Sequence, residues 1–340
     1  MRIAQVSTMS APVRKDGGGS VESLVWLLTR EFTRLGHEVT VFGTDGSQTN
    51  GKLVATLRGP YGARDSLDDW QLCEWVNLCA AVKRSEDFDI IHTHAYLWGM
   101  PLESFSRARM VHTTHIVPDA DAAKLWSINP GSTVTALSDH QWSEFSHLKP
   151  AAVIPHGVDV TAFTFRPDPE DYVVYLGRFV PGKGPCQAIK AARAAGVPMV
   201  LAGPRNNYYN EHVQPLVDGS LVRYVGPVNS SERDKLLGSA RALVYSIQYP
   251  EAFGLVLVEA MLCGTPIAAM RLGAVPEIVD EGLSGFCADT ADKLPQAITR
   301  CFELDRKRIH QRAVERFNAE RMARDYLQLY ERLLAKGSPS

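Results

Sequence analysis

Short runs of β-branched and apolar residues alternate with longer segments of helical period along almost the whole chain. The first such unit has a buried strand at 3–6, a helix at 21–35 and a second strand at 38–42. Gly36 ends the helix before the second strand begins. A strand, a helix and a strand in this order are typical of parallel βαβ units. The repetition of this unit predicts an α/β fold built on doubly wound parallel sheets.

The pattern falls into two series of strands separated by a linker. The first series is predicted at 3–6, 38–42, 89–92, 110–114, 133–137 and 152–154, and the second at 172–176, 198–201, 221–225, 242–246, 266–269 and 285–287. Prolines and a glycine mark 155–171 as the linker. At 340 residues the chain is long enough for about two domains. We therefore expect domains at 1–160 and 161–317, and a final helix at 318–336 that packs back on the first domain.

The charged residues nearly balance, with 36 Lys and Arg against 38 Asp and Glu and a formal net charge of -2. Because no global field attracts nucleic acid or anionic lipid, any anion must be bound locally. No apolar run reaches the length of about 18 residues that a membrane span needs, and the N-terminus does not resemble a signal peptide. The six cysteines form no close pair. We expect a soluble cytoplasmic protein with reduced thiols, and the sequence leaves a homodimer open.

Two cations, Arg178 and Lys183, flank a turn of glycine and proline after the strand at 172–176. The helix that follows Gly184 presents free amide groups at its positive end. Both side chains and this helix end are therefore able to bind one diphosphate. The alternative is a tight turn between strand and helix with solvated charges.

Two carboxylates, Glu251 and Glu259, stand eight positions apart around an apolar helix start. Gly254 between them permits close approach of the backbone, so that the helix N-terminus meets an anion while Glu251 points from the preceding loop into the same site. Glu259 lies within an apolar helix, and a buried carboxylate needs a partner. Hydroxyls of a ribose and a neighbouring Arg or Lys are both suitable partners.

In this order and at these spacings, the motifs resemble the retaining glycosyltransferases of the GT-B fold, in particular the family-four type that uses nucleotide sugars. Glu251 and Glu259 match the E-x7-E signature of that family, and Arg178 and Lys183 match its diphosphate-binding cations. The resemblance implies two facing Rossmann-like domains with the donor cleft between them. The N-terminal domain would then bind the acceptor and the C-terminal domain the nucleotide sugar.

Other segments carry the same resemblance. The segment 153–159 resembles the connection between the two domains of the family, with His156 where the family usually has asparagine. The glycines at 17–19 and the segment 35–39 resemble the N-terminal glycine loop and the end of the first helix. The match therefore covers nearly the whole chain.

The resemblance also implies a role for each matching residue. Arg178 and Lys183 would neutralise the donor diphosphate. Glu259 would hold the nucleotide ribose and Glu251 hydroxyls of the transferred sugar, while His115 would reach that sugar from the first domain. The remaining donor-binding positions, chiefly backbone groups near the sugar, phosphate and base, are Phe253, Gly254, Leu255, Gly203, Val228, Gly18 and Gly19. We expect UDP or GDP as the nucleotide of the co-substrate, and no cofactor.

Candidate acceptor-binding positions lie in the first domain and are Asp16, Gly17, His94, Tyr96 and Trp98. The two aromatic residues are suited to stack on an acceptor ring or to simple packing. Histidines end two neighbouring strands at His92, His94, His112 and His115. A zinc site is the alternative there, but hydrogen bonds to ligand hydroxyls explain these residues and we expect no metal. Asp87 and Asp89 form a D-x-D pair that we interpret as capping, because it precedes a strand.

We expect a retaining, metal-independent transfer of a sugar from a nucleoside-diphosphate sugar to a hydroxyl of a soluble sugar or small natural product. A nucleotide-sugar epimerase or hydrolase on the same fold is one alternative, with Asp16, Glu251 and Glu277 as its carboxylates. A lipid-linked glycan as the acceptor and an inactive nucleotide-sugar sensor are further alternatives. A NAD-dependent oxidoreductase is the weakest, because the glycine loop at 16–20 lacks the G-x-G-x-x-G spacing.

Overall fold

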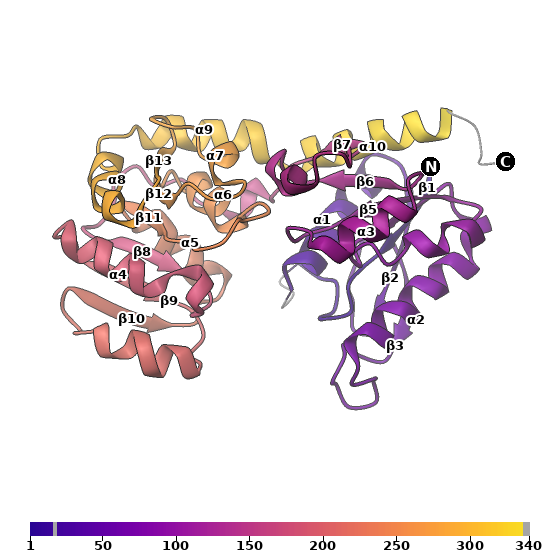
Figure 1. The fold of residues 1–340 in the computed structure, drawn as a ribbon, viewed down its shortest axis with the longest axis horizontal. Coiled ribbons are helices and arrows are strands. Elements are labelled where there is room, and N and C mark those ends of the chain that lie inside the picture. The colour runs from indigo at the N-terminus through magenta and orange to yellow at the C-terminus, as the bar shows by residue number, and fades with distance from the viewer. Residues whose placement is uncertain (16–18, 336–340) are drawn as a thin grey trace. The chain divides into compact units, whose positions relative to one another are not determined.

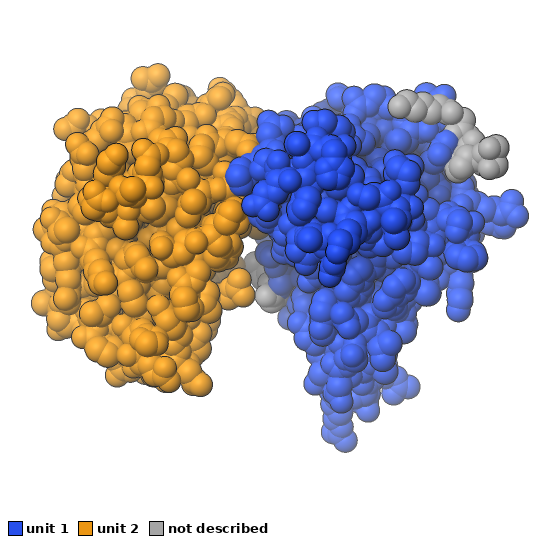
Figure 2. All heavy atoms as spheres, viewed as in Figure 1, with its two compact units in different colours: residues 1–158, 319–340 blue, residues 159–318 orange. Residues whose placement is uncertain are grey.

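The structure of the chain, a computed structural model, describes residues 1–15 and 19–335. It forms two compact units (Figure 2). Unit 1 comprises Met1–Val158 and the C-terminal segment that begins at Ala319, and unit 2 comprises Asp159–Asn318. Each unit contains one parallel sheet with its helices, as the alternating pattern predicted (Figure 1). No helix within the described ranges is long and apolar enough to cross a membrane.

The described residues of unit 1 form a seven-stranded sheet with the strand order β3-β2-β1-β4-β5-β6-β7. Its strands are β1 (Arg2–Val6), β2 (Glu38–Thr44), β3 (Lys52–Leu57), β4 (Ile90–Thr93), β5 (Arg109–Thr113), β6 (Thr133–Ala136) and β7 (Ala152–Val153). Its helices are α1 (Ser20–Arg34), α2 (Trp70–Lys83), α3 (Ala120–Ile128) and α10 (Ala319–Ala335).

Residues 159–318, all of which are described, form a six-stranded sheet with the order β10-β9-β8-β11-β12-β13. Its strands are β8 (Val173–Leu176), β9 (Met199–Ala202), β10 (Val222–Gly226), β11 (Ala242–Tyr245), β12 (Ile267–Met270) and β13 (Gly285–Ala288). Its helices are α4 (Pro185–Ala194), α5 (Ser230–Ser239), α6 (Leu255–Leu262), α7 (Val275–Ile278), α8 (Leu294–Cys301) and α9 (Arg306–Phe317).

Both faces of the unit 1 sheet are covered, because successive residues of a strand point to opposite sides. Ile3, Ile90 and Val111 pack with α1 and α10 on one face, while Ala4, Ile91 and Met110 pack with α2 on the other. Strands buried on both faces explain the continuous apolar runs in the sequence. The doubly wound prediction is therefore confirmed.

The sequence analysis identified no strand between Gly43 and Asp69. A strand, β3, lies there and pairs in parallel with β2 at the edge of the sheet. Its side chains are exposed or only half-buried, so the segment lacks the apolar run by which the buried strands were recognised. The helix α2, which follows β3 after a loop, was also not predicted.

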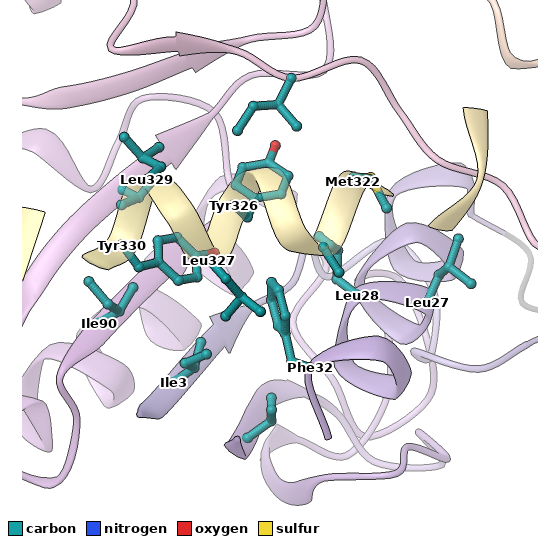
Figure 3. Packing of buried hydrophobic residues seen from close by; sticks show 14 of the residues in the cluster. Ile3, Leu27, Leu28, Phe32, Ile90, Met322, Tyr326, Leu327, Leu329 and Tyr330 are labelled. Carbon is teal, nitrogen blue, oxygen red and sulfur yellow. The ribbon is translucent and has the colours of Figure 1, made fainter. Parts of the chain in front are cut away.

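The C-terminal helix α10 completes the core of unit 1 (Figure 3). Met322, Tyr326 and Tyr330 project from one side of this helix onto α1 and the sheet, and all three are fully buried. Phe32 of α1 packs against Tyr330 with 5.9 Å between the ring centres. The amphipathic period of the last helix thus finds its partner in residues more than 280 positions earlier in the chain.

We expect Phe32→Ala to lower the free energy of unfolding of unit 1 by about 3–5 kcal/mol, because it removes a fully buried ring between α1 and α10. Phe32→Leu, which keeps most of the apolar volume, should cost much less. Urea unfolding followed by circular dichroism measures both. Phe105→Ala is the control, because Phe105 is 74% exposed and should change little. Equal losses for Phe32→Ala and Phe105→Ala would contradict the role of this contact.

Candidate functional site

Four neighbouring strands of unit 2 end at the same edge of the sheet, because they are parallel. Their loops carry, in the order β8, β9, β10 and β11, the predicted residues Arg178, Gly203, Val228 and Glu251. The hydrogen bonding between β8 and β9 continues at the end of the strands, where the amide of Gly177 donates to the backbone oxygen of Ala202 over 3.1 Å. Ligands of doubly wound sheets bind outside such strand ends. The two donor motifs of the sequence therefore lie at an edge where this fold binds ligands.

An ion pair joins the loop after β8 to the loop after β11. Lys183 Nζ donates to Glu251 Oε2 over 2.7 Å, and the two side chains are only 19% and 16% exposed. The same ammonium lies 5.2 Å from the ring centre of Tyr249, within range of a cation–π interaction. A partly buried pair of this kind is screened less by salt than a surface pair. Lys183 of the first motif and Glu251 of the second thus belong to one cluster.

Gly184 allows these two loops to approach each other. Its backbone has a φ of +67°, and a β-carbon at this position would lie 1.9 Å from the backbone oxygen of Ser246. Ser246 Oγ in turn donates to the oxygen of Gly184 over 2.7 Å. Only glycine combines this conformation with so close a contact. The contact holds Lys183, the preceding residue, beside the end of β11.

Tyr245, the last residue of β11, is a third member of the cluster that sequence analysis missed. Its hydroxyl donates to Glu251 Oε2, the oxygen that also accepts from Lys183. Burial and the charge of Glu251 raise the pKa of Tyr245 well above its ordinary value, so the hydroxyl remains protonated and acts as a donor. The available signal was a tyrosine at the carboxyl end of a buried strand, directly ahead of the loop that carries Glu251.

Glu259 lies on α6 and pairs with Arg233 of α5. Arg233 Nη1 is 3.0 Å from Glu259 Oε1, and the glutamate side chain is 14% exposed. Burial raises the pKa of Glu259, whereas the charge of Arg233 acts to lower it. Of the two partners that the sequence left open, the ion pair is therefore present. The ribose contact stays a prediction.

The start of α6 combines a glycine turn with an uncapped helix end. Gly254 precedes the helix with φ +90° and ψ +67°, and no side chain caps the first turn, which begins at Leu255. The uncapped turn places the positive end of the helix dipole at this edge of the sheet. Phe253 is buried, so its contribution to a ligand would come from the backbone. Arg178 is exposed in the loop after β8, where its backbone oxygen accepts from Tyr175 over 2.9 Å.

A pocket of about 460 Å³ opens at the end of β10 and is lined by Arg205, Tyr224, Val225, Gly226 and Pro227. The Arg205 guanidinium lies 5.0 Å from the ring centre of Tyr224. Tyr224 also donates from its hydroxyl to the backbone oxygen of Gly203 over 2.8 Å. The sequence placed the nucleotide base near Gly203 and Val228, beside this pocket, but did not identify Arg205 or Tyr224.

In unit 1 a chain of hydrogen bonds links His115 to the interior of the sheet. His115 Nε2 lies 3.0 Å from His94 Nδ1, and His115 Nδ1 lies 3.4 Å from His156 Nε2. His94 Nε2 in turn lies 2.8 Å from Gln5 Oε1. His156, the departure from the family pattern, is therefore a neighbour of the predicted site histidine.

These contacts assign the ring protons. Burial lowers the pKa of His115 to about 4 and the pKa values of His94 and His156 well below the ordinary value, so all three rings are neutral near pH 7. The carbonyl of Gln5 only accepts, which places the His94 proton on Nε2. His94 Nδ1 then accepts from His115 Nε2, and His115 Nδ1 accepts from His156.

The other predicted histidines also bond to protein groups rather than projecting toward a ligand. His92 lies 2.7 Å from the hydroxyl of Tyr330 and 2.8 Å from that of Thr113. His112 lies 2.6 Å from Glu103 Oε1. Within residues 1–15 and 19–335, no three His, Cys, Asp or Glu side chains are placed to hold a metal ion. The expectation that ligand hydroxyls account for these histidines was therefore wrong for His92 and His112, which the fold itself employs.

Three predicted residues of the glycine loop, Asp16, Gly17 and Gly18, lie outside the described residues. Gly19 is the N-cap of α1 and has an extended backbone. Tyr96 and Trp98 follow β4 and pack against each other with 5.3 Å between ring centres.

The D-x-D pair at Asp87 and Asp89 has a structural role. Asp89 accepts from the backbone amide of Arg2 over 2.8 Å and from its guanidinium over 2.9 Å. Asp87 accepts from Arg84 over 3.0 Å. Both aspartates therefore pair with arginines and neither caps a helix, so the interpretation of this pair as capping was wrong.

We expect unit 1 to lose stability as the pH falls from 7.5 to 5.0. The unfolded chain binds a proton on each histidine near pH 6.5, whereas folded His115 binds one only near pH 4. Below about pH 6.5 the unfolded state holds more protons, and the free energy of unfolding falls by about 1.4 kcal/mol per pH unit for each such histidine, or about 2 kcal/mol over the whole window. His115→Asn should show a smaller loss, measured as the difference between urea unfolding free energies at the two pH values.

Comparing the pH slope of the His115→Asn variant with that of the unchanged protein cancels the contributions of other titrating groups. One of these is Glu74, whose pKa is raised to about 7 by burial and which acts in the opposite direction. His147→Asn, which changes an exposed histidine of the same unit, is the control. An unchanged pH slope in His115→Asn would show that His115 is not held neutral by the fold.

Comparison with known proteins identifies the family. Residues 17–162 match the family model described as Glycosyltransferase Family 4, and residues 161–316 match the model described as Glycosyl transferases group 1. Among curated relatives, the D-inositol 3-phosphate glycosyltransferase of Mycolicibacterium smegmatis is 28% identical over 95% of this chain and 87% of its own length. The enzyme of the same name from Corynebacterium efficiens is 25% identical over 93% and 91%.

Solved structures share the fold over the full length. AviGT4, a glycosyltransferase involved in avilamycin A biosynthesis, has a TM-score of 0.76 at 24% identity over 100% of both chains. Sucrose-phosphate synthase from Thermosynechococcus elongatus has a TM-score of 0.79 at 21% identity, over 99% of this chain and 100% of its own. Anabaena HepE in complex with UDP and glucose has a TM-score of 0.71 at 18% identity over the same shares. The chain therefore belongs to the family-four type of glycosyltransferases and has their GT-B fold.

Proposed function

We propose that the protein transfers a sugar from a nucleoside-diphosphate sugar to a hydroxyl of a soluble acceptor, with retention of configuration and without a metal ion. The observation that supports this most directly is the Lys183–Glu251 pair, held at the carboxyl edge of the unit 2 sheet. Relatives that act as glycosyltransferases support the reaction class. The UDP complex of HepE makes UDP the first candidate for the nucleotide.

The cations supply what a departing diphosphate needs. An ammonium has three N–H donors, of which Lys183 gives one to Glu251 and a second to the hydroxyl of Tyr245 over 3.5 Å, so the third remains for a phosphate oxygen. Arg178 adds an exposed planar fork, and the uncapped first turn of α6 adds positive potential. Fixed positive groups of this kind typically lower a barrier by several kcal/mol when negative charge develops beside them.

The two glutamates have different tasks in this proposal. Oε2 of Glu251 is taken by Lys183 and Tyr245, whereas Oε1 accepts only a 3.2 Å hydrogen bond from the amide of Ala252. We assign Oε1 to a hydroxyl of the transferred sugar. Glu259 uses Oε1 for Arg233, and we assign its second oxygen to a ribose hydroxyl.

In the proposed reaction the bond between the anomeric carbon and the diphosphate oxygen breaks as the acceptor oxygen forms its bond on the same face. The departing phosphate oxygen takes the acceptor proton, so no side chain is assigned as a general base. His115 is neutral, and both of its ring nitrogens bond to neighbouring histidines. A sugar hydroxyl would bond to its Nδ1 only by displacing His156, and the neutral ring is unsuited to donate a proton as an acid.

We expect Lys183→Ala to lower turnover by at least about a hundredfold, because it removes a cation from the leaving group. Initial rates of nucleoside-diphosphate release with a saturating acceptor measure the effect. Lys190→Ala, on the exposed side of the helix that follows, is the matched control and should retain normal rates. A folded Lys183→Ala protein with near-normal turnover would reject the assignment.

We expect UDP to raise the melting temperature more than GDP, ADP or TDP in a thermal-shift panel. A ligand at 100 times its Kd stabilises the folded state by about 2.7 kcal/mol. The Lys183→Ala variant should lose most of this shift, whereas Lys190→Ala should keep it. A panel in which no nucleoside diphosphate stabilises the protein would contradict a nucleotide-sugar donor.

Product analysis separates transfer from the alternatives. With the preferred nucleotide sugar, a transferase makes a new glycoside only when an acceptor is present, and the anomeric configuration of that glycoside tests retention. A hydrolase releases free sugar without an acceptor, and an epimerase returns an altered nucleotide sugar. Either of these products as the main outcome would overturn the proposal.

A further inference from the structure

Unit 1 carries a cluster of four aromatic rings, of which two are exposed and two are half-buried. We call Trp70, Trp75, Tyr96 and Trp98 the aromatic platform. Trp98 is its centre, with ring-centre distances of 5.2 Å to Trp70, 5.3 Å to Tyr96 and 6.4 Å to Trp75. The planes of these three rings lie within 33° of the plane of Trp98, and Trp75 is nearly parallel to it at 8°.

The platform is open to solvent and has an apolar border. Trp70 is 40% exposed and Trp75 37%, although tryptophan is normally well buried. The neighbouring side chains that are also exposed are Tyr61, Leu67, Leu72 and Val76. Exposed aromatic side chains that gather on a folded unit are typical of a binding site.

The platform lies where this fold binds ligands. Tyr96 and Trp98 belong to the loop after the carboxyl end of β4, and the amide of Tyr96 donates to the backbone oxygen of His94. Among the described residues, the non-glycine positions with a positive φ are Tyr96, in this loop, and Asp65, in the loop that leads to α2. Strained backbone of this kind clusters at functional sites. One of the two strained positions, Tyr96, therefore belongs to the platform itself.

The charges around the platform select against an anionic ligand. The segment 58–76 contains two cations, Arg58 and Arg64, against four acids, and the loop at 95–99 contains no charge. Asp65 and Asp68 are exposed beside the rings and can accept hydrogen bonds from hydroxyls. A phosphorylated acceptor or an anionic membrane would meet repulsion here, whereas a neutral polyhydroxylated ring would find both apolar faces and acceptors.

A buried carboxyl group between the two tryptophans of α2 is incompletely bonded. Glu74 is 2% exposed, and its Oε1 accepts from the amide of Met9 over 2.8 Å. Its Oε2 has no hydrogen-bond partner among the described residues. An unsatisfied buried oxygen is costly, and a hydroxyl from a ligand or a water molecule would satisfy it.

We propose that the aromatic platform is the acceptor subsite and that it stacks against the neutral sugar ring of a glycan or glycoside. This inference rests on the proposed glycosyl transfer and adds the chemical class of the acceptor. The C–H face of the sugar lies on the indole rings, and its hydroxyls bond to the acids at the border. The subsite differs in this respect from one that selects an inositol phosphate, which would require cations at the same place.

The test uses the intact protein and follows binding and turnover separately. The ligands are methyl α-glucoside, methyl α-mannoside and maltose as neutral sugars, glucose 6-phosphate as the charged analogue and 4-nitrophenol as a flat aromatic without a sugar. Indole N–H signals in NMR spectra report contact with Trp70, Trp75 and Trp98. We expect at least one neutral sugar to shift these signals, with no shift from glucose 6-phosphate or 4-nitrophenol.

For the sugar that binds, Trp70→Ala and Trp75→Ala should each raise the acceptor KM or Kd by about tenfold, with kcat much less affected. Trp70→Phe should restore most of the affinity, because it keeps an aromatic face. Phe105→Ala, an exposed aromatic elsewhere in unit 1, is the matched control and should leave KM unchanged.

Several outcomes would overturn the proposal. In the NMR experiment these are no indole shift with any neutral sugar, or equal or stronger shifts with glucose 6-phosphate or 4-nitrophenol. In the other assays they are binding to vesicles of phosphatidylglycerol that Trp70→Ala abolishes, and an unchanged acceptor KM in both alanine variants. The thermal shift by UDP is measured on the same samples. If UDP still stabilises the variants while the sugar results fail, the platform assignment is wrong and the donor assignment stands. If UDP stabilises no sample, the transferase proposal itself fails.

Discussion

The ion pair between Lys183 and Glu251 determines how the candidate donor site of unit 2 is organised. Bringing two charges out of water costs free energy, and the cost is recovered only if both charges keep good partners. Tyr245 supplies a second donor to the carboxylate, and the glycine turn at Gly184 holds the lysine in place. A ligand with its own negative charge would share the ammonium with Glu251 instead of meeting a free cation. The pair therefore keeps both side chains ordered before any ligand binds.

Unit 1 follows the opposite electrostatic rule. Its predicted site histidines are neutral imidazoles in series, of which His94 and His115 each accept on one nitrogen and donate on the other. A proton added to any ring would remove an acceptor that the next ring needs, and burial adds a desolvation cost. Gln5 sets the direction of the hydrogen bonds in this series, because its carbonyl accepts from the protonated Nε2 of His94. One buried amide thus fixes the hydrogen-bonding role that His115 presents.

The fold class and the residues of the donor motifs were predictable because both are local properties of the sequence. Buried strands are recognised in the sequence as apolar runs, and the E-x7-E spacing places two carboxylates around a helix start. The edge strand β3 was missed, because its side chains are exposed or only half-buried. Tyr245, the choice of Arg233 as the partner of Glu259, and the contact of His156 with His115 were also beyond the sequence. These contacts join residues that are distant in the chain or that point the same way only once the sheet has formed.

The position of α10 determines the order in which the chain becomes able to fold during synthesis. Unit 2 is one continuous stretch, so all of it is translated before α10. Unit 1 has all its strands much earlier but lacks the helix that covers Phe32, Leu28 and Ile90. At typical translation rates of about 5–20 residues per second, this apolar surface waits on the order of ten seconds for its cover. Unit 1, which is translated first, is therefore completed last. During that interval its uncovered apolar surface is suited to bind a chaperone.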